Sequence, residues 1–274
     1  MPAISTNTAA NSAVRYLNIN SQQETSALSK LSSGSRITSA SDDAAGLAIS
    51  TRISSDVTTL QQAATNASQA TAILQTADGG ASNISDILAR MKSLASESAS
   101  GTVTDSSRAY IQSEFSQLNS EIDSIATGTR YSGQSLLDGS SVFSSGVSVL
   151  VGSTSADTIT ITLTSLTASS LSVTSLDVSS LSSATSAMTA LDTAIDKVSS
   201  ARAEIGAQES RFNFSADSIS TQTQNLQSAN SAIKDVDIAS EQATLSSAEV
   251  KTQAAVSAET AANQMPQYLL KLLG

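Results

Sequence analysis

The chain has 274 residues and a formal net charge of −10, with 39% hydrophobic and only 3% aromatic residues. It contains no His, Cys or Trp, which excludes His-based acid–base catalysis, Cys nucleophiles, disulfides and zinc sites of the usual kind. It has no basic cluster for a nucleic-acid backbone, and no apolar run near the roughly 20 residues that span a bilayer. Few large side chains are available for a thick core, whereas the abundant Ala, Ser and Thr suit close contact between helices.

The N-terminal part of the sequence has a helical pattern. Apolar residues recur at helical spacing over residues 4–31, and Gly34 offers a stop. A second helix should begin at Ser41, with Ser41 as its N-cap and Asp42 and Asp43 at the positive end of the helix dipole. The two carboxylates could instead form a catalytic or metal-binding pair. Capping explains both by position, and the chain has no His to complete a metal site.

Further along, apolar residues follow steps of four and three, which average to the coiled-coil period of 3.5. One such row covers residues 53–74, a bend is expected at residues 78–80, and helix continues over 84–94. Another row covers 111–125 and ends at Gly128. These patterns predict long, narrow helices with sparse apolar seams.

The middle of the chain, residues 141–182, is built differently. It contains no Lys or Arg and alternates Val, Ile or Leu with Ser and Thr. Strict alternation over 158–164 predicts a half-buried strand, and the remainder is expected to form short strands or irregular surface. The hydroxyl groups could carry O-linked glycans, although a bare polar face is the simpler interpretation.

Helical spacing resumes at residues 188–205 and continues to residue 272. A narrow helix with a sparse seam is stable only when that seam meets another one. The simplest partners are the other end of the same chain and the ends of neighbouring copies. The pattern therefore indicates a rod-shaped subunit that assembles. It does not indicate an enzyme, since no familiar nucleophile–base pair is present, and no cofactor is expected.

Two groups of seam residues are expected. The seams at the two ends, predicted to bury against each other and against neighbouring copies on polymerisation, comprise Val14, Leu17, Leu28, Leu31, Ala254, Ala258, Ala261, Met265 and Leu269. The core of a helical bundle between the ends is expected to contain Ile53, Val57, Leu60, Leu74, Leu94, Ile111, Phe115, Leu118, Ile122, Leu191, Ile195 and Val198.

Several segments resemble one family. Residues 30–50 (KLSSGSRITSASDDAAGLAIS) resemble the N-terminal signature of bacterial flagellins, and residues 4–7 (ISTN), 60–67 (LQQAATNA) and 74–79 (LQTADG) fit the same pattern. Residues 228–237 (SANSAIKDVD), 262–267 (ANQMPQ) and the final LLG resemble the C-terminal domain of that family. The resemblance covers roughly residues 1–139 and 184–274, and the middle matches nothing that we can name.

The resemblance implies a mainly α fold, in which the N- and C-terminal segments form a long antiparallel coiled coil and helical bundle. A small β-hairpin and a short β or irregular outer insert complete it. The implied domains are residues 1–40 plus 235–274 for the terminal coiled coil, 41–140 plus 183–234 for the bundle, and 141–182 for the variable surface insert.

The resemblance also implies a structural subunit that polymerises into the bacterial flagellar filament for motility. Its expected location is the extracellular filament, reached through the flagellar type III apparatus without a cleaved signal peptide. Its expected partners are other copies of itself, a flagellar export chaperone, and the cap and hook–filament junction proteins. Neither nucleic acid nor insertion into a membrane is expected.

Arg90, Leu94 and Glu114 resemble positions through which a Toll-like innate receptor binds many flagellins. Ala89 and Ser93, however, stand where the receptor-binding pattern usually carries longer polar side chains. The alternative interpretation places Leu94 in the core and leaves Arg90 and Glu114 solvated or in contact with other subunits.

Two other functions stay open at this point. A hook–filament junction protein shares the terminal helices, and its copy number would distinguish it from a filament subunit. A secreted surface adhesin would use the middle of the chain to bind a ligand. Deletion of residues 141–182 would then abolish adhesion, whereas a filament should survive it.

Overall fold

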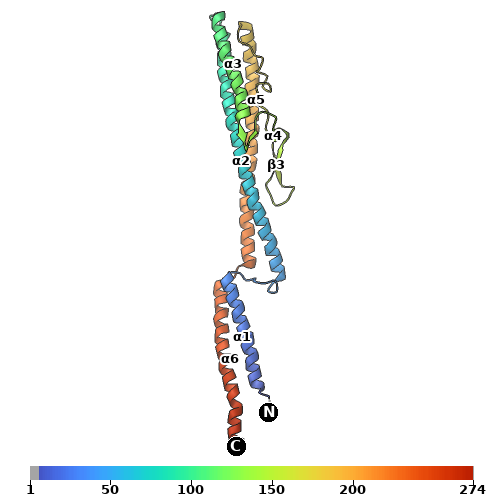
Figure 1. Cartoon of the computed structure of the whole chain (residues 1–274), viewed down its shortest axis with the longest axis vertical. Coiled ribbons are helices and arrows are strands. Elements are labelled where there is room, and N and C mark those ends of the chain that lie inside the picture. The colour runs from blue at the N-terminus through green and yellow to red at the C-terminus, as the bar shows by residue number, and fades with distance from the viewer. Residues whose placement is uncertain (1–5, 274) are drawn as a thin grey trace. The chain divides into compact units, whose positions relative to one another are not determined.

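The computed structural model describes residues 6–273, and the side chains of residues 266 and 269–273 lie outside that description. Figure 1 shows long helices contributed by both ends of the chain. In chain order the elements are α1 (Thr8–Ser33), α2 (Ala44–Ser98), α3 (Asp105–Gly128), β1 (Arg130–Tyr131), β2 (Gln134–Ser135), α4 (Val142–Ser145), β3 (Val147–Leu150), β4 (Thr158–Ile161), α5 (Leu181–Lys234) and α6 (Ile238–Leu273). The predicted fold class is confirmed, because long packed helices dominate and the strands form two small antiparallel hairpins.

The chain separates into two compact units. Residues 1–55 and 225–274 form the first, which we call the terminal unit, and residues 56–224 form the second, which we call the bundle unit. Helices α2 and α5 run from one unit into the other. The finer division into three segments made from the sequence stays a prediction.

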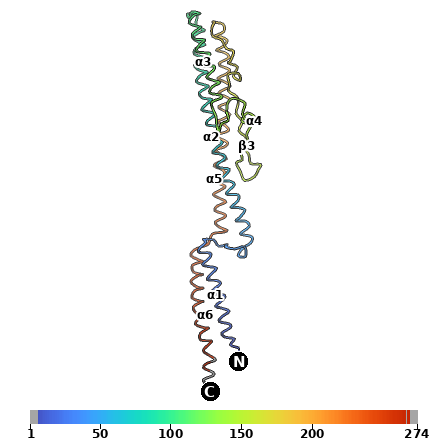
Figure 2. Tube along the Cα trace, viewed as in Figure 1, coloured from blue at the N-terminus to red at the C-terminus, as the bar shows by residue number. Residues whose placement is uncertain are grey.

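In the terminal unit, α1 and α6 lie side by side in opposite directions (Figure 2). Near one end of the pair, Asn7 caps α1 and its Nδ2 donates to the carbonyl of Ala262, at 2.8 Å. At the other end, the amide of Val236 donates to the carbonyl of Gly34, at 3.1 Å. Gly34 ends α1 in the left-handed conformation, with φ of 68°, which a residue without Cβ adopts most easily.

The bundle unit has a continuous apolar core formed by α2, α3, α5 and the middle of the chain. Leu74, Leu88, Phe115, Ile122 and Phe212 are each at most 1% exposed. These large side chains come from three different helices, so α2, α3 and α5 each contribute an apolar seam to one shared core. The bundle unit therefore has a core of its own within one chain.

The bend predicted at residues 78–80 is wrong, because α2 runs without interruption from Ala44 to Ser98. Arg202 on α5 donates from Nε to Asp78 Oδ1 at 2.8 Å, which ties this level of α2 to α5. Gly80 permits close packing instead of a turn, since a Cβ placed there would lie 2.4 Å from Thr129 Oγ1. Helical packing on both sides thus overrides the low helix propensity of the Gly pair.

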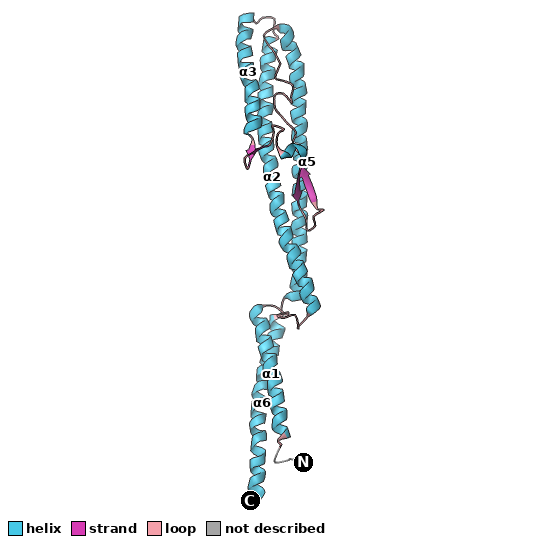
Figure 3. Cartoon of the chain, turned by 45° about the vertical axis from the view of Figure 1, so that its right-hand side comes forward, coloured by secondary structure: helices cyan, strands magenta, loops and turns pink. Residues whose placement is uncertain are grey.

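The strands form two separate hairpins, drawn in magenta in Figure 3. β1 and β2 are antiparallel and joined by Ser132 and Gly133, both with positive φ (49° and 84°), the signature of a tight hairpin turn. β3 pairs with β4 in the register Val147 to Ile161. The strand predicted from the alternating pattern over 158–164 begins where expected and ends at Ile161.

Residues 162–178, which we call the core segment, form no helix or strand yet lie inside the bundle unit. Six apolar side chains of this segment are at most 4% exposed: Leu163, Leu166, Ala168, Leu171, Val173 and Val178. Exposed Ser and Thr residues lie between these buried side chains, so the segment has both buried and solvated positions along its length. Much of the expected surface insert is therefore part of the core.

Helix side chains bind the backbone of the core segment in place of a neighbouring strand. On α3, Gln112 Oε1 accepts from the amide of Val178 at 2.7 Å, and Asp123 Oδ1 accepts from the amide of Ala168 at 2.8 Å. On α5, Gln208 accepts from the Thr162 amide at 3.0 Å and donates to its carbonyl at 2.9 Å. These bonds satisfy polar groups that would otherwise be buried at a cost.

Candidate assembly surface

Within the terminal unit, α1 and α6 meet along one row of residues on each helix. On α6 the residues of this inner row follow steps of three and four: Leu245, Ala248, Thr252, Ala255, Glu259 and Ala262. The four apolar residues are buried, and Thr252 and Glu259 are half-buried. On α1 the matching row contains buried Ala10 and Ala27 and half-buried Leu17, Glu24 and Leu31. The 3.5-residue average identifies a coiled-coil contact with small side chains.

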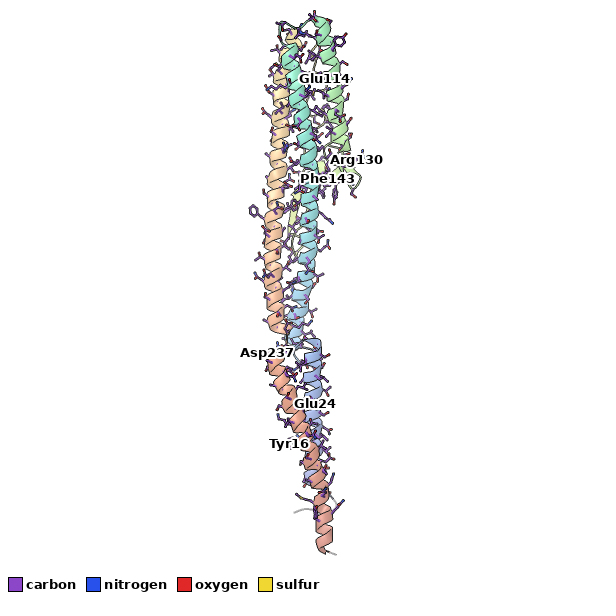
Figure 4. The ribbon with its side chains drawn as sticks, turned by 90° about the vertical axis from the view of Figure 1, so that its left-hand side faces the viewer. Tyr16, Glu24, Glu114, Arg130, Phe143 and Asp237 are labelled. Carbon is purple, nitrogen blue, oxygen red and sulfur yellow. The ribbon has the colours of Figure 1, made fainter. Side chains whose placement is uncertain are left out.

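One polar contact crosses this row. Thr252 Oγ1 donates to Glu24 Oε2 at 3.3 Å, and Glu24 is labelled on α1 in Figure 4. A polar pair in a coiled-coil seam fixes the register of the helices at a cost in stability. With mostly Ala elsewhere in the inner row, the α1–α6 contact buries little apolar surface per turn.

The seam predicted from sequence coincides with this inner row only in part. Leu17 and Leu31 lie on it and are half-buried. The prediction that the remaining residues bury against the other end of the same chain is wrong, because these side chains are exposed: Val14, Leu28, Ala254, Ala258, Ala261 and Met265. The side chain of Leu269 lies outside the described residues. The predicted role of these residues in polymerisation stays a prediction.

The reason for the difference is that α6 carries two parallel apolar rows. Ala254, Ala258, Ala261 and Met265 follow steps of four, three and four, like the inner row, and the three Ala residues each lie one residue before an inner-row position. One residue corresponds to about 100° of rotation, so this outer row forms the adjacent face of the helix. Periodicity alone cannot tell which row contacts α1; the inner row could have been found by extending the 3,4 spacing back to Leu245.

Apolar side chains are exposed on α1 as well. Val14, Tyr16, Ile19 and Leu28 are between 38% and 62% exposed. Tyr268 continues the outer row of α6, and it is 63% exposed. Single exposed apolar residues are common on soluble proteins, but rows at helical spacing are characteristic of a contact surface.

The predicted bundle-core residues are all buried or half-buried, and all except Ile53 belong to the bundle unit. Eight are buried: Leu60, Leu74, Leu94, Ile111, Phe115, Ile122, Leu191 and Val198. Four are half-buried: Ile53, Val57, Leu118 and Ile195. The buried Leu163, Leu166 and Val173 of the core segment were not expected, although alternating Leu and Ser along this stretch was a usable signal.

Arg90 and Glu114, two of the three possible receptor contacts, pair on the surface of the bundle unit. Arg90 donates from both Nε and Nη2 to Glu114 Oε1, at 2.9 and 2.6 Å, and the two side chains are 54% and 46% exposed. Leu94, by contrast, is 2% exposed. It therefore packs in the core and presents no surface to a partner.

Asp42 and Asp43 close the loop between α1 and α2. Asp43 Oδ1 accepts from the amide of Gly46 at 2.8 Å, so Asp43 is the N-cap of α2 and the prediction of Ser41 in that role is wrong. Asp42 accepts from the amide of Ser39 and from the amide and hydroxyl of Thr38. These bonds, led by that of the Ser39 amide, lower the pKa of Asp42 from 3.8 to about 2.

Nothing in the described part of the chain indicates catalysis. Among its residues no group of three or more His, Cys, Asp or Glu is placed to hold a metal ion. One hollow, of about 410 Å³, lies between the core segment and α5 and is lined by Ser and Thr with Leu171, Lys197 and Glu204. None of the described helices has a stretch apolar and long enough to cross a bilayer.

Comparison with known proteins identifies the family. The family model for the bacterial flagellin N-terminal helical region matches residues 4–142, and that for the C-terminal helical region matches residues 188–273. The chain is 35% identical over 272 residues to a flagellin of Halalkalibacterium halodurans, covering 98% of this chain and 99% of the relative. It is 34% identical to a flagellin of Listeria monocytogenes, covering 94% of each chain.

Solved structures agree with this assignment. The crystal structure of Bacillus cereus flagellin aligns with a TM-score of 0.52 and 30% identity, covering 61% of this chain and 94% of that one. A putative flagellar hook-associated protein from Vibrio parahaemolyticus has a TM-score of 0.59 over 71% of this chain and 100% of that chain, but at 15% identity it shows the fold alone. The chain belongs to the bacterial flagellin family. It is a structural subunit of the extracellular flagellar filament, which forms by self-polymerisation, and not an enzyme.

Proposed function

We propose that copies of this chain assemble into the filament through the outer row of α6, Ala254, Ala258, Ala261 and Met265, together with the exposed apolar residues of α1. The observation that carries the proposal is the second 4,3 row on α6, which repeats the spacing of a coiled-coil seam while α1 occupies the adjacent face. A second seam at that spacing suits a second helix. Another copy of the chain is the partner that the family supplies.

Burial of apolar surface favours assembly of many copies over a single chain in which only α1 and α6 pair. Burial of an exposed Leu or Met side chain contributes about 1.5–3 kcal/mol, and a methyl group about 0.8 kcal/mol. Leu28 is 58% exposed and Met265 62% exposed in the single chain, so both have most of that contribution still to gain. Each copy in a helical polymer repeats the same contacts, so modest rows give a stable lattice.

The remaining partners follow from family membership. We propose that an export chaperone, the cap protein and the hook–filament junction protein bind at the ends of the chain, where α6 exposes its outer row and α1 exposes single apolar side chains. The division into a terminal coiled coil (1–40 plus 235–274), a bundle (41–140 plus 183–234) and a middle insert (141–182) is proposed on the same basis. For a Toll-like innate receptor, the exposed Arg90–Glu114 pair supports a contact and the burial of Leu94 does not.

The test compares two substitutions one residue apart on α6. Ala258→Glu places a carboxylate on the outer row, and Ser257→Glu places the same charge on another exposed face. Both positions are exposed in the single chain, so helix content by circular dichroism should match the parent in each case. We expect Ala258→Glu to raise the critical concentration for seeded polymerisation at least tenfold, measured by sedimentation and electron microscopy, and Ser257→Glu to change it less than threefold.

If Ala258→Glu polymerises as readily as Ser257→Glu and the parent, the assignment of the outer row is contradicted. Loss of polymerisation in both would show that added charge anywhere on α6 is the cause. Counting copies in purified filaments addresses the junction-protein alternative, because a filament subunit repeats along the length and a junction protein is confined to the base.

A further inference from the structure

The methionines of this chain differ sharply in their access to solvent. Met91 is 0% exposed in the bundle core, and Met188 on α5 is half-buried. Met265 on α6 is 62% exposed. Met1 lies outside the described residues. The chain has no Cys, so no thiol is present to react first with an oxidant. Met265 is thus the most accessible oxidisable sulfur in the described part of the chain.

Met265 also has a particular position, since it belongs to the outer row together with Ala258 and Ala261. In a row of Ala residues the long, flexible thioether supplies much of the apolar surface available for contact. We propose that Met265 is an oxidation-sensitive modification site, at which a peroxide converts an assembly-competent subunit into one that polymerises poorly. This proposal rests on assembly through the outer row.

The chemistry is a two-electron oxygen transfer. The Met265 sulfur attacks one oxygen of hydrogen peroxide, and an S–O bond forms as the O–O bond breaks. The transferred oxygen loses its proton, and the second oxygen takes up that proton and leaves as water. Sulfur is oxidised and the peroxide is reduced. The product sulfoxide is a strong hydrogen-bond acceptor, and Ala258 and Ala261 offer no side-chain donor to it. Burial of an unpaired acceptor is unfavourable, so the modified row loses affinity for a second copy.

The exposure of Met265 determines whether free or assembled subunits are oxidised. In the free subunit Met265 is open to solvent and to oxidants. In the polymer, contact through the outer row covers it, so an assembled subunit is protected by its neighbours. Oxidation therefore acts on subunits before incorporation and leaves existing filament largely intact. Methionine sulfoxide reductases, one for each sulfoxide epimer, return the sulfoxide to the thioether with a thiol as the reductant and so reverse the effect.

The experiment treats purified full-length chain with hydrogen peroxide, locates the added oxygen by peptide mass mapping, and measures the critical concentration of seeded polymerisation. We expect oxidation at Met265 to raise that concentration at least tenfold, and reductase treatment to restore it. Met265→Leu, which keeps the apolar volume, should polymerise like the parent with or without peroxide. Met188→Leu should remain as sensitive as the parent. In assembled filaments, oxidation of Met265 should be at least tenfold slower than in subunits.

The outcomes separate this inference from the assembly proposal. Met265→Gln places a polar side chain at the same site without any oxidant. If it polymerises at the parental concentration, the outer row is not the contact and the assembly proposal fails. If Met265→Gln is impaired but the sulfoxide form polymerises normally, only the oxidation proposal is overturned. It is overturned equally if Met265→Leu loses polymerisation in peroxide as the parent does, since the damage then lies elsewhere.

Discussion

Although the core segment has no regular structure, a buried side chain within it should stabilise the bundle unit as strongly as one on a helix. Leu166 is 1% exposed, and its amide donates to the Leu137 carbonyl at 2.8 Å. Leu166→Ala removes three carbon groups, which at about 0.8 kcal/mol each corresponds to about 2.4 kcal/mol of transfer free energy. The cavity left behind adds to this, so the expected loss of unfolding free energy is about 2–5 kcal/mol.

Urea unfolding followed by circular dichroism measures this loss. With a slope of about 2 kcal/mol per molar urea, the midpoint of the bundle transition should fall by about 1–2.5 M at an unchanged slope. The matched control is Leu181→Ala, the same chemical change at a side chain that is 48% exposed, for which we expect less than about 1 kcal/mol. Equal midpoints for the two variants would refute the assignment of residues 162–178 to the core.

The remaining predictions concern the Gly pair of α2 and the loop before that helix. Gly79→Ala should raise the free energy of unfolding by about 0.5–1 kcal/mol, and with it the thermal midpoint, because nothing lies within 4 Å of the added Cβ and Ala favours helix. Gly80→Ala should lower it, because its Cβ would lie 2.4 Å from Thr129 Oγ1; shifts of the same sign would contradict this packing. Asp42 has a folded pKa of about 2 against an ordinary 3.8, so its contribution to stability is present above pH 3.8 and is lost as the pH falls toward 2. The destabilisation caused by Asp42→Asn, followed by thermal melts, should therefore shrink over that interval, and a difference independent of pH would count against these hydrogen bonds.

The apolar rhythm of the sequence predicted the helices but not the face that each helix uses. Spacing in steps of three and four identified α6 correctly, yet the residues chosen for contact with α1 belong to its outer row. A seam pattern reports that a helix has an apolar stripe. When two stripes lie about 100° apart, as they do around Ala254 and Ala255, only the three-dimensional arrangement determines which one the chain covers.

Local rules failed where a neighbouring element changed the outcome. The Gly pair at 79 and 80 has low helix propensity, but α2 continues through it, where Gly80 lies against Thr129 and Leu137 and Asp78 pairs with Arg202 of α5. Asp43, and not Ser41, caps α2, because its carboxylate accepts from the Gly46 amide. The neighbouring Asp42 instead binds Thr38, at the start of the loop. Both outcomes depend on tertiary contacts that no window of the sequence contains.

The middle of the chain was the hardest part to interpret. Its Ser and Thr content resembles exposed loop, and the hydrogen bonds from Gln112, Asp123 and Gln208 cannot be inferred from local sequence. These buried contacts change the experiment that separates an adhesin from a filament subunit. Deletion of residues 141–182 removes core side chains and would destabilise the bundle, so it cannot separate an adhesive from a structural role. Substitutions in the exposed turn at residues 153–156 leave the core intact and provide that test.

The two apolar rows of α6 lie on adjacent faces of the helix, and α1 contacts only one of them. The inner row contacts α1 through Ala residues and through half-buried Thr252 and Glu259, so the pair alone buries little. The outer row has the same spacing, but its side chains are exposed in the described part of the chain. Because the ends carry little net charge, with 0 on residues 1–60 and −2 on residues 230–274, they can approach neighbouring copies without strong repulsion. The −8 on residues 61–229 opposes close contact between bundle units, so attraction between copies is strongest where α1 and α6 lie. Under the assembly proposed above, a chain with this distribution reaches its lowest free energy when other copies cover the outer row.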